Sequence, residues 1–179
     1  MNRALGEAVI SDFDGTLARL EVPWQALRET LSVGRIDELW LDADMGRWET
    51  VARAEVDAAR TASPLPAVMD ALSDVRVVTV LTSNDEAAVE MFLDRWPELG
   101  AKVRAVVGRR ALGGPKTDFH VFSAGYAGCV RAIGATGASH APIAYIGDMS
   151  YELDYARRLG ATAFDVKDIQ APSQPPGEG

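Results

Sequence analysis

From residue 8 to residue 17 the chain has the sequence AVISDFDGTL, an apolar run that ends in two aspartates, a glycine and a threonine. A short apolar run rich in β-branched residues and followed by a turn signal is typical of a buried strand. Side chains of an extended segment alternate between faces, so Asp12 and Asp14 can point the same way, and Gly15 permits the sharp turn after them. Two carboxylates this close repel each other unless a cation lies nearby. Mg²⁺, which prefers oxygen ligands, is the cation we expect.

Further apolar segments predict more strands, five in all: residues 8–13, 75–82, 102–107, 141–146 and 161–165. Helical spacing of apolar residues separates them, most clearly at 89–96 and 119–133. Asn84 or Asp85 is the expected cap of the first of these helices. Strands rich in Val and Ile that alternate with helices indicate a parallel sheet covered on both faces, a doubly wound α/β fold. Ligands bind such sheets at the carboxyl ends of the strands.

The segment after the first strand breaks this alternation and predicts two or three short helices, which we expect to form a cap over the strand ends. The predicted division is an α/β core at residues 1–17 and 64–169, a helical cap at 18–63, and a disordered tail at 170–179 that is rich in Pro and Gly. Trp24, Trp40 and Trp48 either line a substrate pocket or form the core of the cap. We favour the core, because so small a subdomain needs large aromatics.

Composition excludes several classes of function. A chain of 179 residues fits one domain with a small insert, and its formal net charge of −8 disfavours nucleic acid as a partner. No apolar run approaches the length of a membrane span, and residues 1–7 do not lead into a signal-type core, so we expect a cytoplasmic protein with no membrane partner. The lone Cys129 cannot form an internal disulfide, and His120 and His140 are too few for a His-rich zinc site or a Ser-His-Asp triad.

A second acidic cluster follows the fourth predicted strand, at residues 147–152 with the sequence GDMSYE. If this strand lies beside the first, Asp148 completes the metal site, and Glu152 orients it or a bound water.

Groups that attract phosphate follow the second predicted strand. Thr82, Ser83 and Asn84 offer hydroxyls and free backbone amides where a helix begins, an arrangement that favours an anion. Lys116 adds an ammonium group on a flexible stem. Arg109 and Arg110 are expected to form a solvated pair rather than a substrate contact.

Taken in this order, Asp-x-Asp-Gly-Thr, a strand ending in Thr or Ser, a later Lys and Gly-Asp-x-x-x-Asp/Glu resemble the motifs of the haloacid dehalogenase-like superfamily, over residues 9–166. The resemblance implies that Asp12 is a nucleophile that forms an aspartyl-phosphate and that Asp14 is the general acid and base. It further implies that Thr82 and Lys116 bind the phosphate, with Ser83 as the alternative hydroxyl, and that Mg²⁺ is held by Asp12, the backbone carbonyl of Asp14, and Asp148.

The function implied by this resemblance is hydrolysis of a small phosphorylated metabolite. Asp14 implies a phosphatase, because the haloacid dehalogenases lack this second acid. The alternatives are a phosphotransferase or phosphomutase that uses the same aspartyl-phosphate, and a non-catalytic protein that binds a phosphorylated ligand. A receiver-like signalling domain is disfavoured, because its acidic pair and its phospho-acceptor lie on different strands.

Overall fold

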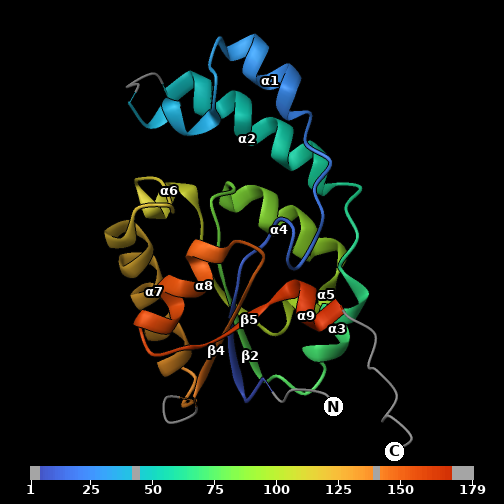
Figure 1. Cartoon of the computed structure of the whole chain (residues 1–179). Coiled ribbons are helices and arrows are strands. Elements are labelled where there is room, and N and C mark those ends of the chain that lie inside the picture. The colour runs from blue at the N-terminus through green and yellow to red at the C-terminus, as the bar shows by residue number, and fades with distance from the viewer. Residues whose placement is uncertain (1–4, 42–44, 139–141, 171–179) are drawn as a thin grey trace, which may run out of the picture.

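The computed structural model describes residues 5–41, 45–138 and 142–170, and its centre is a sheet of five parallel strands in the order β3-β2-β1-β4-β5 (Figure 1). The strands are β1 (Ala8–Ser11), β2 (Val77–Leu81), β3 (Val103–Val107), β4 (Ile143–Gly147) and β5 (Thr162–Asp165). All five lie within one or two residues of their predicted ranges, so the predicted doubly wound α/β fold is confirmed. Ala141, predicted to start the fourth strand, and His140 lie outside the described residues, as does the predicted tail beyond Gln170.

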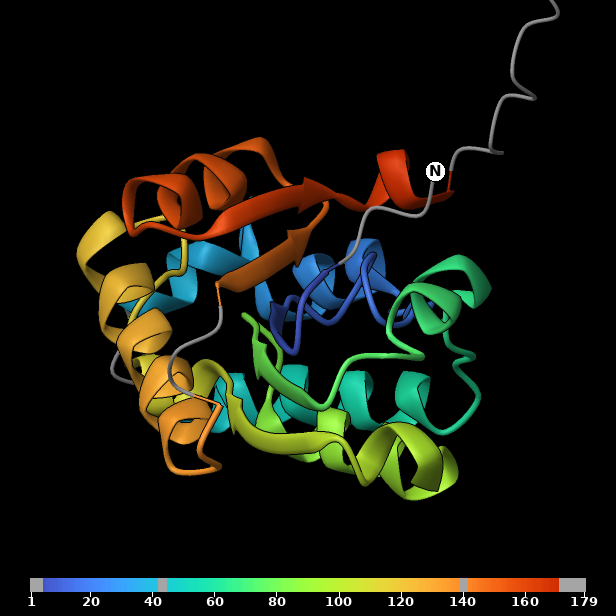
Figure 2. The same cartoon turned by 90° about the horizontal axis from the view of Figure 1, so that it is seen from below.

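Helices cover both faces of the sheet (Figures 1 and 2). One layer holds α3 (Pro66–Ala71), α4 (Glu86–Arg95), α5 (Pro97–Gly100) and α9 (Val166–Gln170), and the other holds α6 (Arg109–Leu112), α7 (Phe119–Gly134) and α8 (Ser150–Arg158). The alternation of side chains along a strand explains the two cores. Val9 packs with the first layer, whereas Ala8 and Ile10 pack with the second, and all three are fully buried.

Aspartates begin the two longest core helices. Asp85 accepts a hydrogen bond from the amide of Ala87 at the start of α4, which decides between the two predicted caps. Asp118 accepts from the amides of His120 and Val121 at the start of α7. Such caps satisfy backbone donors that have no partner within the helix.

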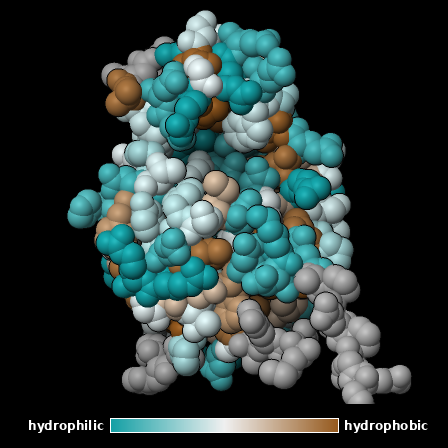
Figure 3. All heavy atoms as spheres, viewed as in Figure 1, coloured by the Kyte–Doolittle hydropathy of each residue, from teal (hydrophilic) through white to brown (hydrophobic). Residues whose placement is uncertain are grey.

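The cap helices lie over the carboxyl ends of the strands: α1 (Trp24–Leu31), the short 3₁₀ helix η1 (Ile36–Leu41) and α2 (Met45–Ala59) (Figure 1). Leu31, Leu39 and Val51 form their small apolar cluster. In the space-filling view, the surface where these helices meet the core mixes hydrophilic and hydrophobic side chains (Figure 3). Within the described ranges, no helix combines the length and the apolar character needed to cross a membrane.

Candidate active site

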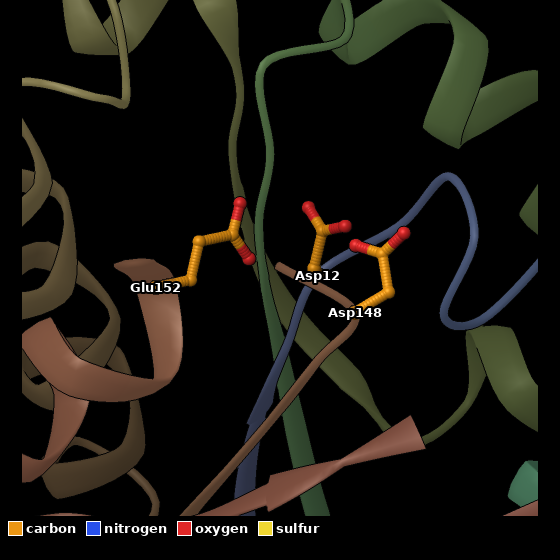
Figure 4. Close-up of side chains that lie close together, drawn as sticks. All are labelled: Asp12, Asp148 and Glu152. Atoms are coloured by element: carbon orange, nitrogen blue, oxygen red, sulfur yellow. The ribbon is translucent and has the colours of Figure 1, made fainter. Parts of the chain in front are cut away.

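The strands bring the two acidic motifs together at the edge of the sheet beneath the cap. Asp12 follows β1 and Asp148 follows β4, and these strands are neighbours whose pairing continues to the hydrogen bond from the Asp12 amide to the Ile146 carbonyl, at 2.9 Å. Glu152 lies in the first turn of α8. One carboxylate oxygen from each of Asp12, Asp148 and Glu152 lies within 4.8 Å of the others (Figure 4).

Gly15 allows the two acidic motifs to approach this closely. Its φ of +81° is a conformation that favours glycine, and a Cβ there would lie 2.5 Å from the nearer oxygen of Asp148. The turn directs the Asp14 carboxylate toward the start of the cap segment, where Oδ1 accepts a hydrogen bond of 2.8 Å from the Leu20 amide. Asp14 is therefore outside the group of three carboxylates, and its expected metal contact is its backbone carbonyl.

Lys116 contacts both acidic motifs. Its buried ammonium lies 2.5 Å from Asp12 Oδ1 and 2.7 Å from Glu152 Oε1, and it donates to the Leu81 carbonyl at 3.1 Å. Burial alone would lower the pKa of this ammonium, but the two carboxylates outweigh burial and raise the pKa above its ordinary value. Lys116 is thus held as a permanent cation.

Glu152 is fixed by donors on three residues. Besides Lys116, the hydroxyls of Tyr145 and Tyr151 donate to it, at 2.8 and 3.1 Å. Glu152 is buried, and burial raises its pKa above the ordinary range, against the opposing effect of Lys116. The arrangement gives Glu152 a direct contact with the lysine, which the sequence did not predict.

Negative charge exceeds positive charge among these residues. Burial raises the pKa of Asp14 to about 6, and the charges of Asp12 and Asp148 add to the effect, while the Leu20 amide lowers it. Burial and the Asp12 charge also raise the pKa of Asp148. Burial and mutual repulsion both make the charged forms of these carboxyls unfavourable, and a proton or a metal ion can relieve that cost.

The predicted phosphate ligands lie beside this group and line the same cavity. Thr82 is buried, and its hydroxyl donates to Asn84 Oδ1 at 2.9 Å and accepts from the Asn84 amide at 3.1 Å. Ser83 is exposed. The structure therefore brings all the predicted site residues to one cavity, although it does not test their roles.

Solved structures with a similar architecture include an L-2-haloacid dehalogenase from Xanthobacter autotrophicus, with a TM-score of 0.55 and 18% identity over 88% of this chain and 76% of that one. A protein provisionally assigned as a phosphoglycolate phosphatase from Lactobacillus plantarum gives a TM-score of 0.59 and 14% identity over 93% and 89%. The chain has the fold of the haloacid dehalogenase-like hydrolases. No family model matches the sequence, and no curated protein matches it.

A further structure with this fold is a hydrolase of subfamily IA from Geobacter sulfurreducens, with a TM-score of 0.53 and 18% identity over 88% of this chain and 87% of that one. Identities this low establish the fold and leave the chemistry to the site. Because the haloacid dehalogenase-like fold serves both dehalogenases and phosphatases among these neighbours, the reaction has to be argued from the residues themselves.

Sequence reasoning missed a buried ion pair that joins the cap to this haloacid dehalogenase-like core. Glu55 of α2 is 1% exposed, and both of its oxygens accept hydrogen bonds from Arg109, which is 5% exposed. Glu55 also accepts from Asn84 Nδ2 and from the Asp85 amide, each at 3.0 Å. The expected solvated arginine pair is therefore wrong for Arg109, because Glu55 compensates its charge. It holds for Arg110, whose side chain is exposed.

One signal in the sequence points to Glu55. It lies on the same helical face as the buried residues Val51, Ala52 and Ala59 of α2, three or four positions from the nearest of them. An acid in an apolar stripe has to find a buried partner. The partner itself, 54 positions away in the chain, could not be named from this pattern.

The cavity between the cap and the core has a volume of about 410 Å³. Trp24, Trp40 and Trp48 are half-buried and line it, and Trp24 and Trp48 also pack against the apolar cluster of the cap. Both interpretations of these tryptophans therefore apply to Trp24 and Trp48, whereas Trp40 lies outside that cluster.

Proposed function

We propose that this chain is a Mg²⁺-dependent phosphomonoester hydrolase that acts on a small phosphorylated metabolite through an aspartyl-phosphate on Asp12. The observation that supports this best is the position of Asp14, a carboxyl that follows Asp12 by two residues and lines the same cavity. An alkoxide leaving a phosphate ester needs a proton, whereas a halide leaves as a stable anion. A carboxyl placed beside the nucleophile to give that proton is therefore useful to a phosphatase and unnecessary to a dehalogenase.

The donor set fits Mg²⁺. The Asp12 and Asp148 carboxylates and the Asp14 backbone carbonyl offer oxygen atoms only, which this ion prefers, and the surplus of negative charge attracts it. Glu152 is already held by Lys116 and two tyrosines, so its role in the proposal is to orient the site. When bound, Mg²⁺ supplies positive charge that neutralises the phosphoryl oxygens.

In the first step an Asp12 oxygen attacks phosphorus, the bond from phosphorus to the ester oxygen breaks, and Asp14 gives its proton to the departing oxygen. Lys116 holds Asp12 Oδ1 and thereby fixes the orientation of the nucleophile. The Thr82 hydroxyl, which now donates to Asn84, rotates to donate to a phosphoryl oxygen.

In the second step Asp14 takes a proton from a water molecule, the water oxygen attacks phosphorus, and the bond from phosphorus to Asp12 breaks. Phosphate leaves and both aspartates return to their starting states. Most of the acceleration comes from positioning and charge compensation.

Phosphate release from p-nitrophenyl phosphate and from an alkyl phosphate, with Mg²⁺ and after chelation, tests the proposal. Asp12→Asn should lower turnover of both esters by at least about a thousandfold. Asp14→Asn should slow the alkyl ester more than the aryl ester, because the aryl oxygen leaves with less need for a proton. Asp154→Asn on the exposed face of α8 is the matched control and should be active.

Several outcomes would contradict the proposal. Turnover of 2-chloropropionate without phosphate release would indicate a dehalogenase. A burst of aspartyl-phosphate with little free phosphate until an acceptor is added would indicate a phosphotransferase. Binding of phosphate esters with no turnover by the unaltered chain would indicate a non-catalytic protein.

A further inference from the structure

Aromatic rings line the cavity on the side of the cap. The indoles of Trp24, Trp40 and Trp48 reach it from α1, η1 and α2, and the Tyr151 ring reaches it from α8. The same cavity holds Asp12 and Asp14 at the strand ends. A phosphate group bound at the acids therefore places the rest of its ester against aromatic surface.

The cations of this cavity already have anionic partners. Among the described residues that line it, the cations are Arg35, Arg109 and Lys116. Lys116 contacts Asp12 and Glu152, and the two terminal guanidinium nitrogens of Arg109 donate to Glu55. These two pairs are buried, so neither cation is available to a second anionic group on a substrate without breaking a buried ion pair.

Arg35 differs from these two cations because its ion pair is exposed rather than buried. It pairs with Asp37 at 3.0 Å, but its side chain is 75% exposed. Exposed pairs of this kind contribute little and separate easily. Arg35 is therefore the one described cation of the cavity that a charged substrate can recruit, and it lies at the solvent side.

Two of the structural neighbours are linked to small carboxylates: one is provisionally assigned as a phosphoglycolate phosphatase, and the other holds covalently bound chloropropionic acid. Phosphoglycolate and the chloropropionic acid bound in a second Xanthobacter structure both carry a carboxylate. Burying a carboxylate with no partner costs several kcal/mol, as an order of magnitude. The buried part of this cavity therefore suits an uncharged group better.

Of the three tryptophans that line the cavity, Trp40 is the one that does not pack against the apolar cluster of the cap. Its ring centroid lies 4.8 Å from that of Trp48, and it is absent from the apolar cluster of the cap. The Trp48 ring also packs against Arg109, whose guanidinium lies 4.6 Å from the centroid of the ring. A planar ring on the substrate gains offset or edge contacts with such indoles that a saturated ring of the same size does not.

Resting on the proposed function, we propose that the ester's alcohol is uncharged and carries a planar aromatic ring that packs against Trp40 and its neighbouring indoles.

Three alkyl phosphates separate the contributions of ring, size and charge. Benzyl phosphate and cyclohexylmethyl phosphate have rings of similar size on the same kind of leaving oxygen, and phosphoglycolate has a carboxylate in place of a ring. We expect kcat/KM for benzyl phosphate to exceed that for the saturated ester by about three- to tenfold, and that for phosphoglycolate by at least about tenfold.

Trp40→Leu should remove the preference for benzyl over cyclohexylmethyl phosphate by raising KM for the benzyl ester. Trp96→Phe, a tryptophan beside Phe92 in the core, is the matched control and should keep the preference. Calorimetric titration of the Asp12→Asn protein gives the same comparison without a cap variant. The benzyl ester should bind about three- to tenfold more tightly than the saturated ester.

The outcomes are distinguishable. Equal turnover and equal binding of the two ring esters, or a preference that survives Trp40→Leu, overturns the assignment to the indoles. A preference for phosphoglycolate that is lost in Arg35→Gln overturns the uncharged leaving group, while phosphate release still supports the hydrolase. No release from any of the three esters or from p-nitrophenyl phosphate refutes the hydrolase and this inference together.

Discussion

Two buried ionic groups lie about the same cavity, and they differ in their balance of charge. The acid cluster, made of Asp12, Asp14, Asp148, Glu152 and Lys116, sets four carboxyl groups around one ammonium. The cap pair, made of Glu55 and Arg109, sets one carboxylate against one guanidinium. The charges of the cap pair cancel and Glu55 accepts four hydrogen bonds, whereas the acid cluster keeps raised carboxyl pKa values.

The difference separates a structural ion pair from a site that needs a ligand. A buried pair whose charges cancel fixes the position of its elements, here α2 against the start of α4 and α6. Arg95 supports the same join by donating to the Ala59 and Ala62 carbonyls. A cluster whose charges do not cancel has residual affinity for a proton or a cation, and that affinity is what a metal-dependent enzyme uses.

The largest effect is expected from Lys116→Met. Removing the only ammonium of the acid cluster should lower turnover by at least about a thousandfold. It should also destabilise the metal-free protein by about 3 to 5 kcal/mol, because buried carboxylates lose their partner. Urea unfolding with and without Mg²⁺ measures the second effect, and Mg²⁺ should offset part of it. If Mg²⁺ left the variant's stability unchanged, the cluster would not be a cation site.

Arg109→Met breaks the cap pair and should cost about 3 to 5 kcal/mol with no recovery on adding Mg²⁺. Replacing both partners, Glu55→Leu with Arg109→Met, should cost much less than the sum of the two single changes, because no buried charge is left alone. A double-mutant cycle from urea unfolding gives the coupling. If the losses in stability of the two single variants added up in the double variant, or if Mg²⁺ restored stability, Glu55 and Arg109 would not be a structural ion pair that needs no ligand.

Asp14→Asn should stabilise the metal-free protein at pH 7. The folded-state pKa of about 6 lies above the ordinary 3.8, so folding favours the protonated form and the wild type loses stability as pH rises between these values. Asn cannot ionise and still accepts from the Leu20 amide. The gain over wild type should be absent below about pH 4 and reach about 1 to 2 kcal/mol above about pH 6, allowing for solvent screening. Unfolding curves across this range with a chelator present measure it, and a variant that is less stable at pH 7 contradicts it.

The smallest effect is expected from Arg110→Ala. Arg110 is 69% exposed and donates to Asp85 Oδ2 at 2.8 Å, at the edge of the cap pair. Exposed ion pairs contribute about 0.2 to 1 kcal/mol, so stability should fall by no more than that and phosphate release should be unchanged. A loss of stability as large as that of Arg109→Met would mean that Arg110 is part of the structural ion-pair group together with Glu55 and Arg109.

The acid cluster could be predicted from the sequence and the cap pair could not. Asp12 and Asp14 are separated by one residue in the chain, and Asp148 follows a strand that the alternation of strands and helices places beside the first. The rule that parallel strands end at one edge then brings them together. Glu55 lies on the cap helix α2 and Arg109 begins the short core helix α6, and no such rule relates them.

Local chemistry determined the five strands, the helix caps and the acidic motifs, because apolar periodicity and turn residues act over a few positions of the chain. Tertiary structure alone decided that Arg109 is buried against Glu55, that Trp40 faces the cavity while Trp24 and Trp48 also pack inside the cap, and that Glu152 holds Lys116. These features depend on how the cap lies on the core and on which side chains then lose water. The free energy of a buried charge or ring is set by its neighbours in space, and these can be distant in the chain: Lys116 is 104 positions from Asp12.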